Sequence, residues 1–285
     1  MRNRIEFEPL TGCIGARVHG VDLNGEIGDE LMGELRRRLL DHLVLLFPNQ
    51  DLSPAAHVAL GQRLGELTAR HPIYRSVEGF DDIMIIENGP DRSPDSEEWH
   101  KDMTFRSNPP QCSLLHAKVL PSRGGDTMFA NLQAVYDDLS PEMQAFLEGL
   151  TAVHDMEAGF GRSLLRNGEH ERLAAIRGLK EEDRTNVHPV VGIHPITGRK
   201  YLGVDDCFVS RIVELSDPES DGVLGMLRAI IKEPKYHLRI RWQPNDLGVW
   251  DNVSTQHIGV GDYNEYRRMH RVTVGRYHDV AAVAA

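Results

Sequence analysis

The stretch Trp99-His100-Lys101-Asp102-Met103-Thr104-Phe105 places a histidine and a carboxylate two residues apart in a segment with the pattern of a strand. Side chains two residues apart on a strand leave the same face, so the His100 imidazole and the Asp102 carboxylate can converge on one ion. One distant histidine would complete a 2-His-1-carboxylate set, which leaves three positions open on a non-haem Fe(II). The stretch therefore predicts a strand that carries part of a metal site.

Short strand patterns bounded by Gly, Pro, Asn and Asp recur along the rest of the chain. They are predicted at residues 5–10, 14–18, 44–47, 83–86, 113–120, 125–130, 151–155, 190–194, 200–204, 237–242, 247–251 and 271–277. Helical patterns are expected at residues 29–42, 54–64, 132–139, 141–150 and 220–232, with a helical or mobile excursion at 162–187.

Many short strands with peripheral helices predict a mainly β protein whose core is a double-stranded β-helix, the jelly-roll or cupin-like architecture. A doubly wound α/β sheet is the alternative, but the strands do not alternate regularly with helices. No internal repeat or low-complexity linker divides the sequence, so residues 1–285 are expected to form one domain.

Composition excludes several classes of protein. The net charge of −11 argues against a nucleic-acid surface, which needs clustered Lys and Arg. The longest apolar stretches are too short to span a bilayer, and the N-terminus has no apolar signal-peptide region. The three cysteines show no CxxC spacing, so neither a disulfide framework nor a zinc knuckle is predicted. We expect a cytoplasmic protein with no membrane and no nucleic-acid partner.

Four other motifs offer groups that suit a site around the His/Asp pair. They are Gly124-Gly125-Asp126-Thr127, with a hydroxyl; Trp250-Asp251-Asn252 followed by Ser254-Thr255-Gln256-His257; Arg267 and Arg271, four residues apart; and the loop His71-Pro72-Ile73-Tyr74.

With these motifs the sequence resembles the taurine dioxygenase family of Fe(II)- and 2-oxoglutarate-dependent enzymes, which includes 2,4-dichlorophenoxyacetate dioxygenase and alkyl sulfatases. The resemblance runs nearly from end to end. Beyond the stretch 99–105 and the motifs above, it rests on Ile14-Gly15-Ala16-Arg17-Val18-His19-Gly20-Val21-Asp22-Leu23, Val44-Leu45-Leu46-Phe47, Gly65-Glu66-Leu67, Trp242-Gln243-Pro244-Asn245-Asp246 and Met269-His270-Arg271.

The resemblance implies that His100, Asp102 and His257 bind Fe(II), with 2-oxoglutarate as cosubstrate and O2 as oxidant. It also implies that Arg267 and Thr127 bind the distal carboxylate of 2-oxoglutarate, a role for which a forked guanidinium is well shaped. Arg268 is the alternative to Arg267, because the preceding loop is one residue shorter than in the taurine enzyme. The implied reaction hydroxylates the carbon next to the sulfonate of taurine or a related small sulfonate, and releases sulfite, an aldehyde, succinate and CO2.

The substrate side follows from the same resemblance. His71, Tyr74 and Arg271 stand where the taurine enzyme binds its sulfonate, and Phe160 and Phe208 match aromatic walls of that site. Two departures lie near the expected position of the taurine ammonium: Ser96 replaces an asparagine, and Met103 replaces a smaller valine. The small anionic substrate is therefore expected to differ from taurine at its non-anionic end.

Three alternatives remain at this point. The same chemistry could act on an alkyl sulfate, a phosphonate or an aryloxyacetate-type carboxylate. The same three ligands could serve a zinc hydrolase, or the chain could be a metal-free binding protein. The resemblance further implies a homo-oligomer, either a dimer or a tetramer.

Overall fold

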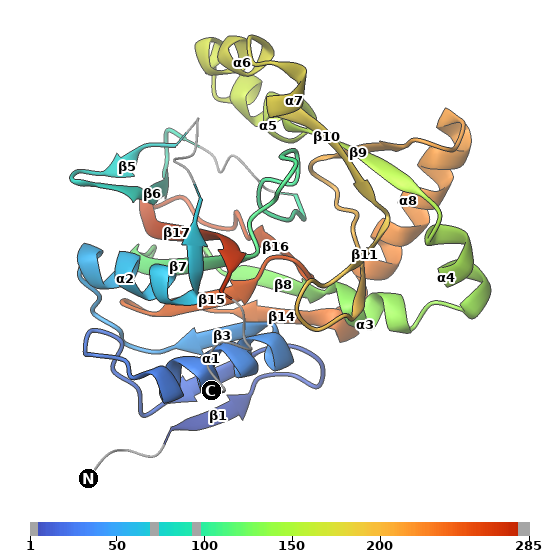
Figure 1. Cartoon of the computed structure of the whole chain (residues 1–285). Helices are drawn as coiled ribbons and strands as arrows, with labels where there is room; N and C mark the ends of the chain where they lie inside the picture. Colours follow the sequence, from blue (N-terminus) through green and yellow to red (C-terminus); the bar gives the residue numbers. More distant parts are fainter. Residues whose placement is uncertain (1–4, 69–73, 93–97, 279–285) are drawn as a thin grey trace.

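The computed structural model describes residues 5–68, 74–92 and 98–278, and its architecture is shown in Figure 1. A nine-stranded sheet has the order β1-β2-β3-β15-β7-β17-β6-β5, with β4 paired to β17. Its strands are β1 (Glu6–Pro9), β2 (Ala16–His19), β3 (Val44–Phe47), β4 (Gly65–Leu67), β5 (Ser76–Val77), β6 (Phe80–Asn88), β7 (Cys112–Val119), β15 (Leu247–Asp251) and β17 (Arg267–Tyr277).

Three smaller sheets complete the β structure. The sheet β14-β8-β16 contains β8 (Thr127–Asn131), β14 (His237–Ile240) and β16 (Thr255–Gly259). The sheet β10-β9-β13 contains β9 (Thr151–Asp155), β10 (Thr185–Pro189) and β13 (Val209–Ile212), and β11 (Val191–Ile193) pairs with β12 (Lys200–Leu202).

The helices lie around the sheets (Figure 1). They are α1 (Asp29–His42), α2 (Pro54–Leu64), α3 (Leu132–Asp137), α4 (Pro141–Leu147), α5 (Met156–Arg166), α6 (His170–Arg177), α7 (Glu181–Arg184) and α8 (Asp217–Ile231), with a 3-10 turn at Pro234–Tyr236. None of the helices in the part of the chain that the structure describes is long and apolar enough to cross a membrane.

Antiparallel pairing dominates, since among the strands described only β2 and β3 pair in parallel. This agrees with the expected jelly roll and excludes the doubly wound α/β sheet, which would need parallel strands joined by helical crossovers.

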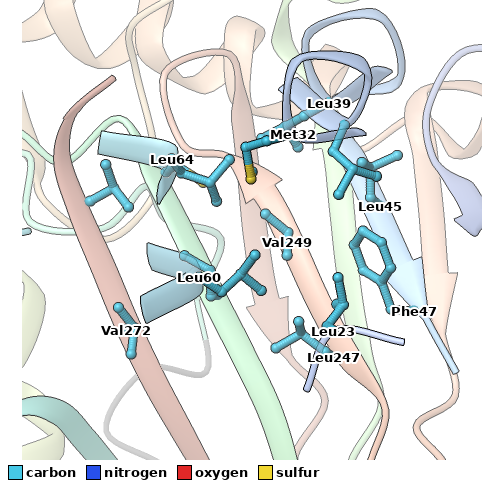
Figure 2. Packing of buried hydrophobic residues seen from close by; sticks show 14 of the residues in the cluster. Leu23, Met32, Leu39, Leu45, Phe47, Leu60, Leu64, Leu247, Val249 and Val272 are labelled. Atoms are coloured by element: carbon cyan, nitrogen blue, oxygen red, sulfur yellow. The ribbon is translucent and has the colours of Figure 1, made fainter. Parts of the chain in front are cut away.

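Alternating side chains on the central strands divide the core into two layers. Leu45 and Phe47 of β3 and Leu247 and Val249 of β15 pack toward α1 and α2, as Figure 2 shows. Trp250, one residue on, belongs to the opposite face and packs with the small sheet β14-β8-β16. Because strand side chains alternate between faces, one continuous apolar run serves both layers.

The small sheet therefore closes over the face of the large sheet that α1 and α2 leave uncovered. Gly248 shows how closely the layers approach: a Cβ at this position would lie 2.6 Å from the Trp242 ring. His257 on β16 and Arg267 and Arg271 on β17 are carried into the space between the two sheets.

The strand expected at residues 99–105 is wrong. His100 forms an isolated bridge with His257, and Asp102 to Phe105 form turns. Met103 has φ of 50°, a left-handed conformation that ends the extended run directly after the aspartate. The turn is buried, so its apolar residues carry the same pattern as a buried strand and the hydrophobicity alone could not distinguish them.

Buried histidines under the large sheet make the stability of the fold depend on pH. His57 on α2 is 1% exposed, and burial, with the nearby His116, lowers its pKa from 6.5 to about 3. Below pH 6.5 the unfolded chain takes up a proton that the folded chain does not, so the free energy of unfolding falls as the pH falls.

We expect His57 alone to cost about 2 kcal/mol of stability between pH 7 and pH 5, since one pKa unit corresponds to about 1.4 kcal/mol. Urea unfolding at the two pH values measures this loss. The variant His57→Leu should show a correspondingly smaller loss, whereas His170→Leu, on an exposed position of α6, should behave as the wild type. An unchanged pH dependence in His57→Leu would contradict the assignment.

Candidate metal centre and substrate cavity

The structure brings His100, Asp102 and His257 together from two remote parts of the chain. One ligand atom from each lies within 4.8 Å of the others, and all three residues are buried. The backbones of His100 and His257 are joined by two hydrogen bonds of 3.0 and 2.8 Å, which places the two imidazoles side by side. The Nε2 atom of His257 lies 3.8 Å from Oδ1 of Asp102.

Neighbouring polar groups hold the ligand residues in place. The Nδ1 atom of His100 lies 2.9 Å from the Glu98 carbonyl oxygen, an arrangement that orients metal-binding imidazoles. The Asn252 side chain accepts from the Asp102 peptide N–H at 2.9 Å, and Ser113 Oγ donates to Asp102 Oδ2 at 2.8 Å. These bonds fix the turn that carries Asp102, which the strand prediction had not anticipated.

Asp251, which precedes Asn252, forms hydrogen bonds with other parts of the chain. Its carboxylate accepts from the hydroxyl of Tyr277 at 3.0 Å and from the Ser254 peptide N–H at 2.9 Å, and it contacts His194 at 3.2 Å. The partners of its side chain are therefore Tyr277, Ser254 and His194, and not the three metal-ligand candidates.

The charges at the site favour an ionised Asp102 carboxylate beside a neutral His257 imidazole. Burial alone would raise the pKa of the Asp102 carboxyl. The nearby Arg271 instead holds this pKa well below its usual range, and its Nη1 donates to Asp102 Oδ1 at 2.6 Å. Burial and the adjacent His100 hold the pKa of His257 well below 6.5. Two imidazole nitrogens and one carboxylate oxygen are the donor set that suits Fe(II) with open positions, so the residues fit this metal.

A cavity of about 90 Å³ opens beside these residues. Its polar wall includes Thr127, Arg267 and Arg271, and its apolar wall includes Leu115 and Trp250. Arg267 and Arg271 are both 7% exposed, and their spacing of four on β17 turns both side chains to the same face.

Arg267 and Thr127 both line the cavity. Arg267 donates through Nε to the Gly125 carbonyl at 3.2 Å. The Thr127 hydroxyl oxygen accepts from Trp242 Nε1 at 2.9 Å, which leaves its own proton available as a donor. Arg268 points elsewhere: it donates to Glu87 at 2.9 Å, and its side chain is 39% exposed.

Only some of the residues expected to bind the substrate are found to line the cavity. Tyr74 lines the cavity together with Arg271, whereas His71 and Ser96 lie outside the described residues. Met103, Phe160 and Phe208 do not line the cavity but form a buried cluster beside it with Phe105. The Phe208 ring centroid lies 6.3 Å from that of His100, so this cluster supports the metal ligand from behind.

Two polar lining residues were missed by sequence reasoning. Asn88 ends β6 directly opposite Arg267 in the strand register, and Tyr263 precedes Arg267 by four residues. The pairing of β6 with β17 is a long-range contact that no local pattern reveals, although Tyr263 could have been considered as part of the segment leading into β17.

Comparison with known proteins agrees with this geometry. The family model described as "Taurine catabolism dioxygenase TauD, TfdA family" matches residues 6–273. An alkylsulfatase from Acinetobacter baylyi is 32% identical over 274 residues, which are 95% of this chain and 85% of that protein. An alpha-ketoglutarate-dependent sulfate ester dioxygenase from Pseudomonas putida is 31% identical over 95% of this chain and 89% of that protein.

A solved structure of a taurine dioxygenase from Burkholderia xenovorans superposes with a TM-score of 0.80 at 29% identity, and covers 98% of both chains. A dioxygenase family model that spans most of the chain gives no support to the zinc-hydrolase alternative. The chain therefore belongs to the taurine dioxygenase (TauD/TfdA) family of Fe(II)- and 2-oxoglutarate-dependent dioxygenases.

Proposed function

We propose that this dioxygenase hydroxylates the carbon next to the oxyanion of a small organic sulfonate or sulfate ester. The observation that carries this proposal is the presence of two buried arginines in the cavity beside the three metal-ligand candidates. One arginine serves the cosubstrate and the other the substrate. When bound by His100, Asp102 and His257, the iron with 2-oxoglutarate and O2 supplies the oxidising chemistry, and the protein supplies position and charge.

Arg267 and Thr127 are proposed to bind the distal carboxylate of 2-oxoglutarate. A guanidinium can bind a carboxylate through two parallel hydrogen bonds, and Thr127 has a proton to donate because its oxygen already accepts from Trp242. Burial makes both interactions stronger than they would be in water. The exposed Arg268, paired with Glu87, is not suited to this role.

Arg267→Met should raise KM for 2-oxoglutarate about 100-fold, because hydrogen bonds to charged groups contribute roughly 1.5–3 kcal/mol each. Thr127→Val should raise it less, by about 10-fold. Succinate formation at increasing 2-oxoglutarate measures both. Arg268→Met is the matched control on the same strand, and an equal effect of Arg267→Met and Arg268→Met would contradict the assignment.

Arg271 is proposed to bind the substrate oxyanion. Its Nε atom is buried and has no hydrogen-bond partner, while its Nη1 binds Asp102. A buried donor without a partner is costly, and an oxyanion in the cavity would satisfy it. Tyr74, on the same cavity wall, is placed to contact the substrate. His71 and Ser96 are proposed to contribute from adjoining segments, with Met103, Phe160 and Phe208 as the packing behind the site.

A sulfate ester is favoured over taurine by the charge of the cavity. Of the described residues that line it, Asp126 is the one carboxylate, and it is paired with Arg239 at 2.6 Å. This leaves no unpaired carboxylate on the described wall for the taurine ammonium. Two relatives named for sulfate esters also support this candidate.

The two substrate classes release different products, which provides the test. A hydroxylated sulfonate carbon breaks its C–S bond and releases sulfite, whereas a hydroxylated sulfate-ester carbon breaks its C–O bond and releases sulfate. Both leave an aldehyde. Purified enzyme with Fe(II), ascorbate and 2-oxoglutarate should convert hexyl sulfate to hexanal and sulfate, and should turn over taurine more slowly. The proposal would be overturned if a phosphonate or an aryloxyacetate triggered succinate formation and neither hexyl sulfate nor taurine did.

A further inference from the structure

A second and much larger cavity lies behind the metal-ligand segment. Its volume is about 730 Å³, compared with about 90 Å³ for the catalytic cavity. It lies where the loop after Asp102 meets β9, β10 and the end of β17, and none of the three metal-ligand candidates lines it. Cavities of about 300–1,000 Å³ are the size that usually holds a small organic molecule.

The charged side chains on its wall are mostly cationic. Lys101, Arg106 and Arg276 line it, against one carboxylate, Glu66. Within the described chain neither arginine forms an ion pair, and Arg106 experiences only the more distant charge of Asp183. Unpaired guanidinium groups around a concave surface attract anions.

Lys101 brings a buried charge to the same wall. Its side chain is 6% exposed, donates to the Val253 carbonyl at 2.7 Å, and lies 4.3 Å from the centre of the Tyr201 ring. An ammonium has three donors, so two remain beyond the bond to Val253. The carboxylates of Asp205 and Asp251 influence Lys101 from a distance without forming an ion pair with it.

His154 lines the cavity but presents no polar atom to it. The residue is 1% exposed, and both of its ring nitrogens are buried beneath protein atoms. Its neighbour His188 is used structurally, because its Nε2 atom contacts the carbonyls of Thr104 and Arg106 and holds the loop in place. The groups on this wall that suit an anion are therefore the cationic side chains of Lys101, Arg106 and Arg276.

The rest of the wall is apolar, with Leu67, Pro109, Pro110 and Pro189. We propose that this cavity is a second binding site, for an organic oxyanion: a carboxylate, sulfonate or sulfate carried on an apolar body. Lys101, Arg106 and Arg276 contact the oxyanion, and the prolines contact the apolar body. The site is separate from the catalytic cavity, yet Lys101 lies between two iron ligands and Asn252, on this wall, binds the Asp102 backbone.

The test uses 8-anilinonaphthalene-1-sulfonate, a fluorescent sulfonate that is too large for the catalytic cavity. The full chain is loaded with Mn(II) and 2-oxoglutarate, so that the catalytic cavity is occupied without turnover. Titration should show one saturable site. Arg106→Met and Arg276→Met should each raise the Kd for the probe at least about 10-fold, as expected for the loss of one hydrogen bond to a charged group.

Arg199→Met is the matched control, since this exposed arginine pairs with Asp137 away from the cavity. The uncharged analogue N-phenyl-1-naphthylamine should bind the wild type at least about 10-fold more weakly than the sulfonate.

Two competitors distinguish the sources of such an anion. Displacement of the probe by succinate would identify the coproduct of the reaction as a ligand, and displacement by hexanoate would identify a monoanion with an apolar chain. Either result supports the proposal. No saturable binding to the wild type, equal binding to the cavity variants and the control, or displacement by neither competitor would overturn it.

Discussion

Asp102→Asn should reduce substrate-triggered succinate formation by more than about 100-fold, since even groups behind metal ligands typically contribute 10–100-fold. The substitution keeps the shape of the side chain but removes the negative charge that a divalent cation needs. It also weakens the bond from Arg271 Nη1 to Oδ1 of residue 102, which is 2.6 Å long, because a neutral amide oxygen replaces the carboxylate oxygen. Succinate production and Fe(II) binding by equilibrium dialysis should therefore decline together.

The control for this variant is Asp221→Asn, at an exposed position of α8. It should bind iron and form succinate as the wild type does. Full activity in Asp102→Asn would remove the carboxylate from the metal site and with it the proposed ligand set.

Arg271→Lys should raise KM for the sulfur-containing substrate about 100-fold while changing KM for 2-oxoglutarate little. The guanidinium can bind Asp102 through Nη1 and still present Nε to an oxyanion, whereas the single ammonium of lysine cannot hold both in that geometry. The loss corresponds to about 2.7 kcal/mol, which is within the range of a hydrogen bond between charged groups. Initial rates at varied substrate and fixed 2-oxoglutarate measure the effect.

Arg268→Lys is the matched comparison, because Arg268 lies on the same strand but is partly exposed and paired with Glu87. It should leave both KM values close to those of the wild type. If Arg271→Lys raised the KM for 2-oxoglutarate and left the KM for the sulfur-containing substrate unchanged, the roles proposed for Arg267 and Arg271 would be reversed.

The sequence predicts those elements best whose signals are local. The helix α2 begins after Ser53, whose hydroxyl accepts from the Ala56 N–H at 3.1 Å, and Pro54 follows at the first helical position, as expected from the residue types. The helix α1 covers residues 29–42 as expected, because its apolar residues follow the helical period.

The remaining errors concern interactions between distant residues. The turn at Asp102 is stabilised by Asn252, 150 residues away, which no local pattern can indicate. Strands β10 and β13 were missed because each forms its hydrogen bonds with β9 and is only partly buried, so the apolar alternation is weak. The segment 162–187 contains the last five residues of α5 and all of α6 and α7, in keeping with the helical form of the expected excursion.

The residues of the metal site were easier to predict from the sequence than the residues of the cavity around it. Its three ligand candidates have distinctive chemistry and lie in motifs of the family, so the resemblance identified them together. Asn88 and Tyr263 have no such chemistry, and their position depends on the pairing of β6 with β17. The different directions of Arg267 and Arg268 likewise depend on the observed register, in which Arg267 lines the cavity and Arg268 pairs with Glu87.

Anaerobic titration of the metal-free protein with Fe(II) and then 2-oxoglutarate tests the ligand set most directly. We expect a weak visible charge-transfer band that saturates at one Fe(II) and one 2-oxoglutarate per chain, and that is absent from His257→Ala at the same concentrations. A wild-type protein that shows no such band, or a His257→Ala variant that shows it undiminished, would contradict a ferrous site formed by His100, Asp102 and His257.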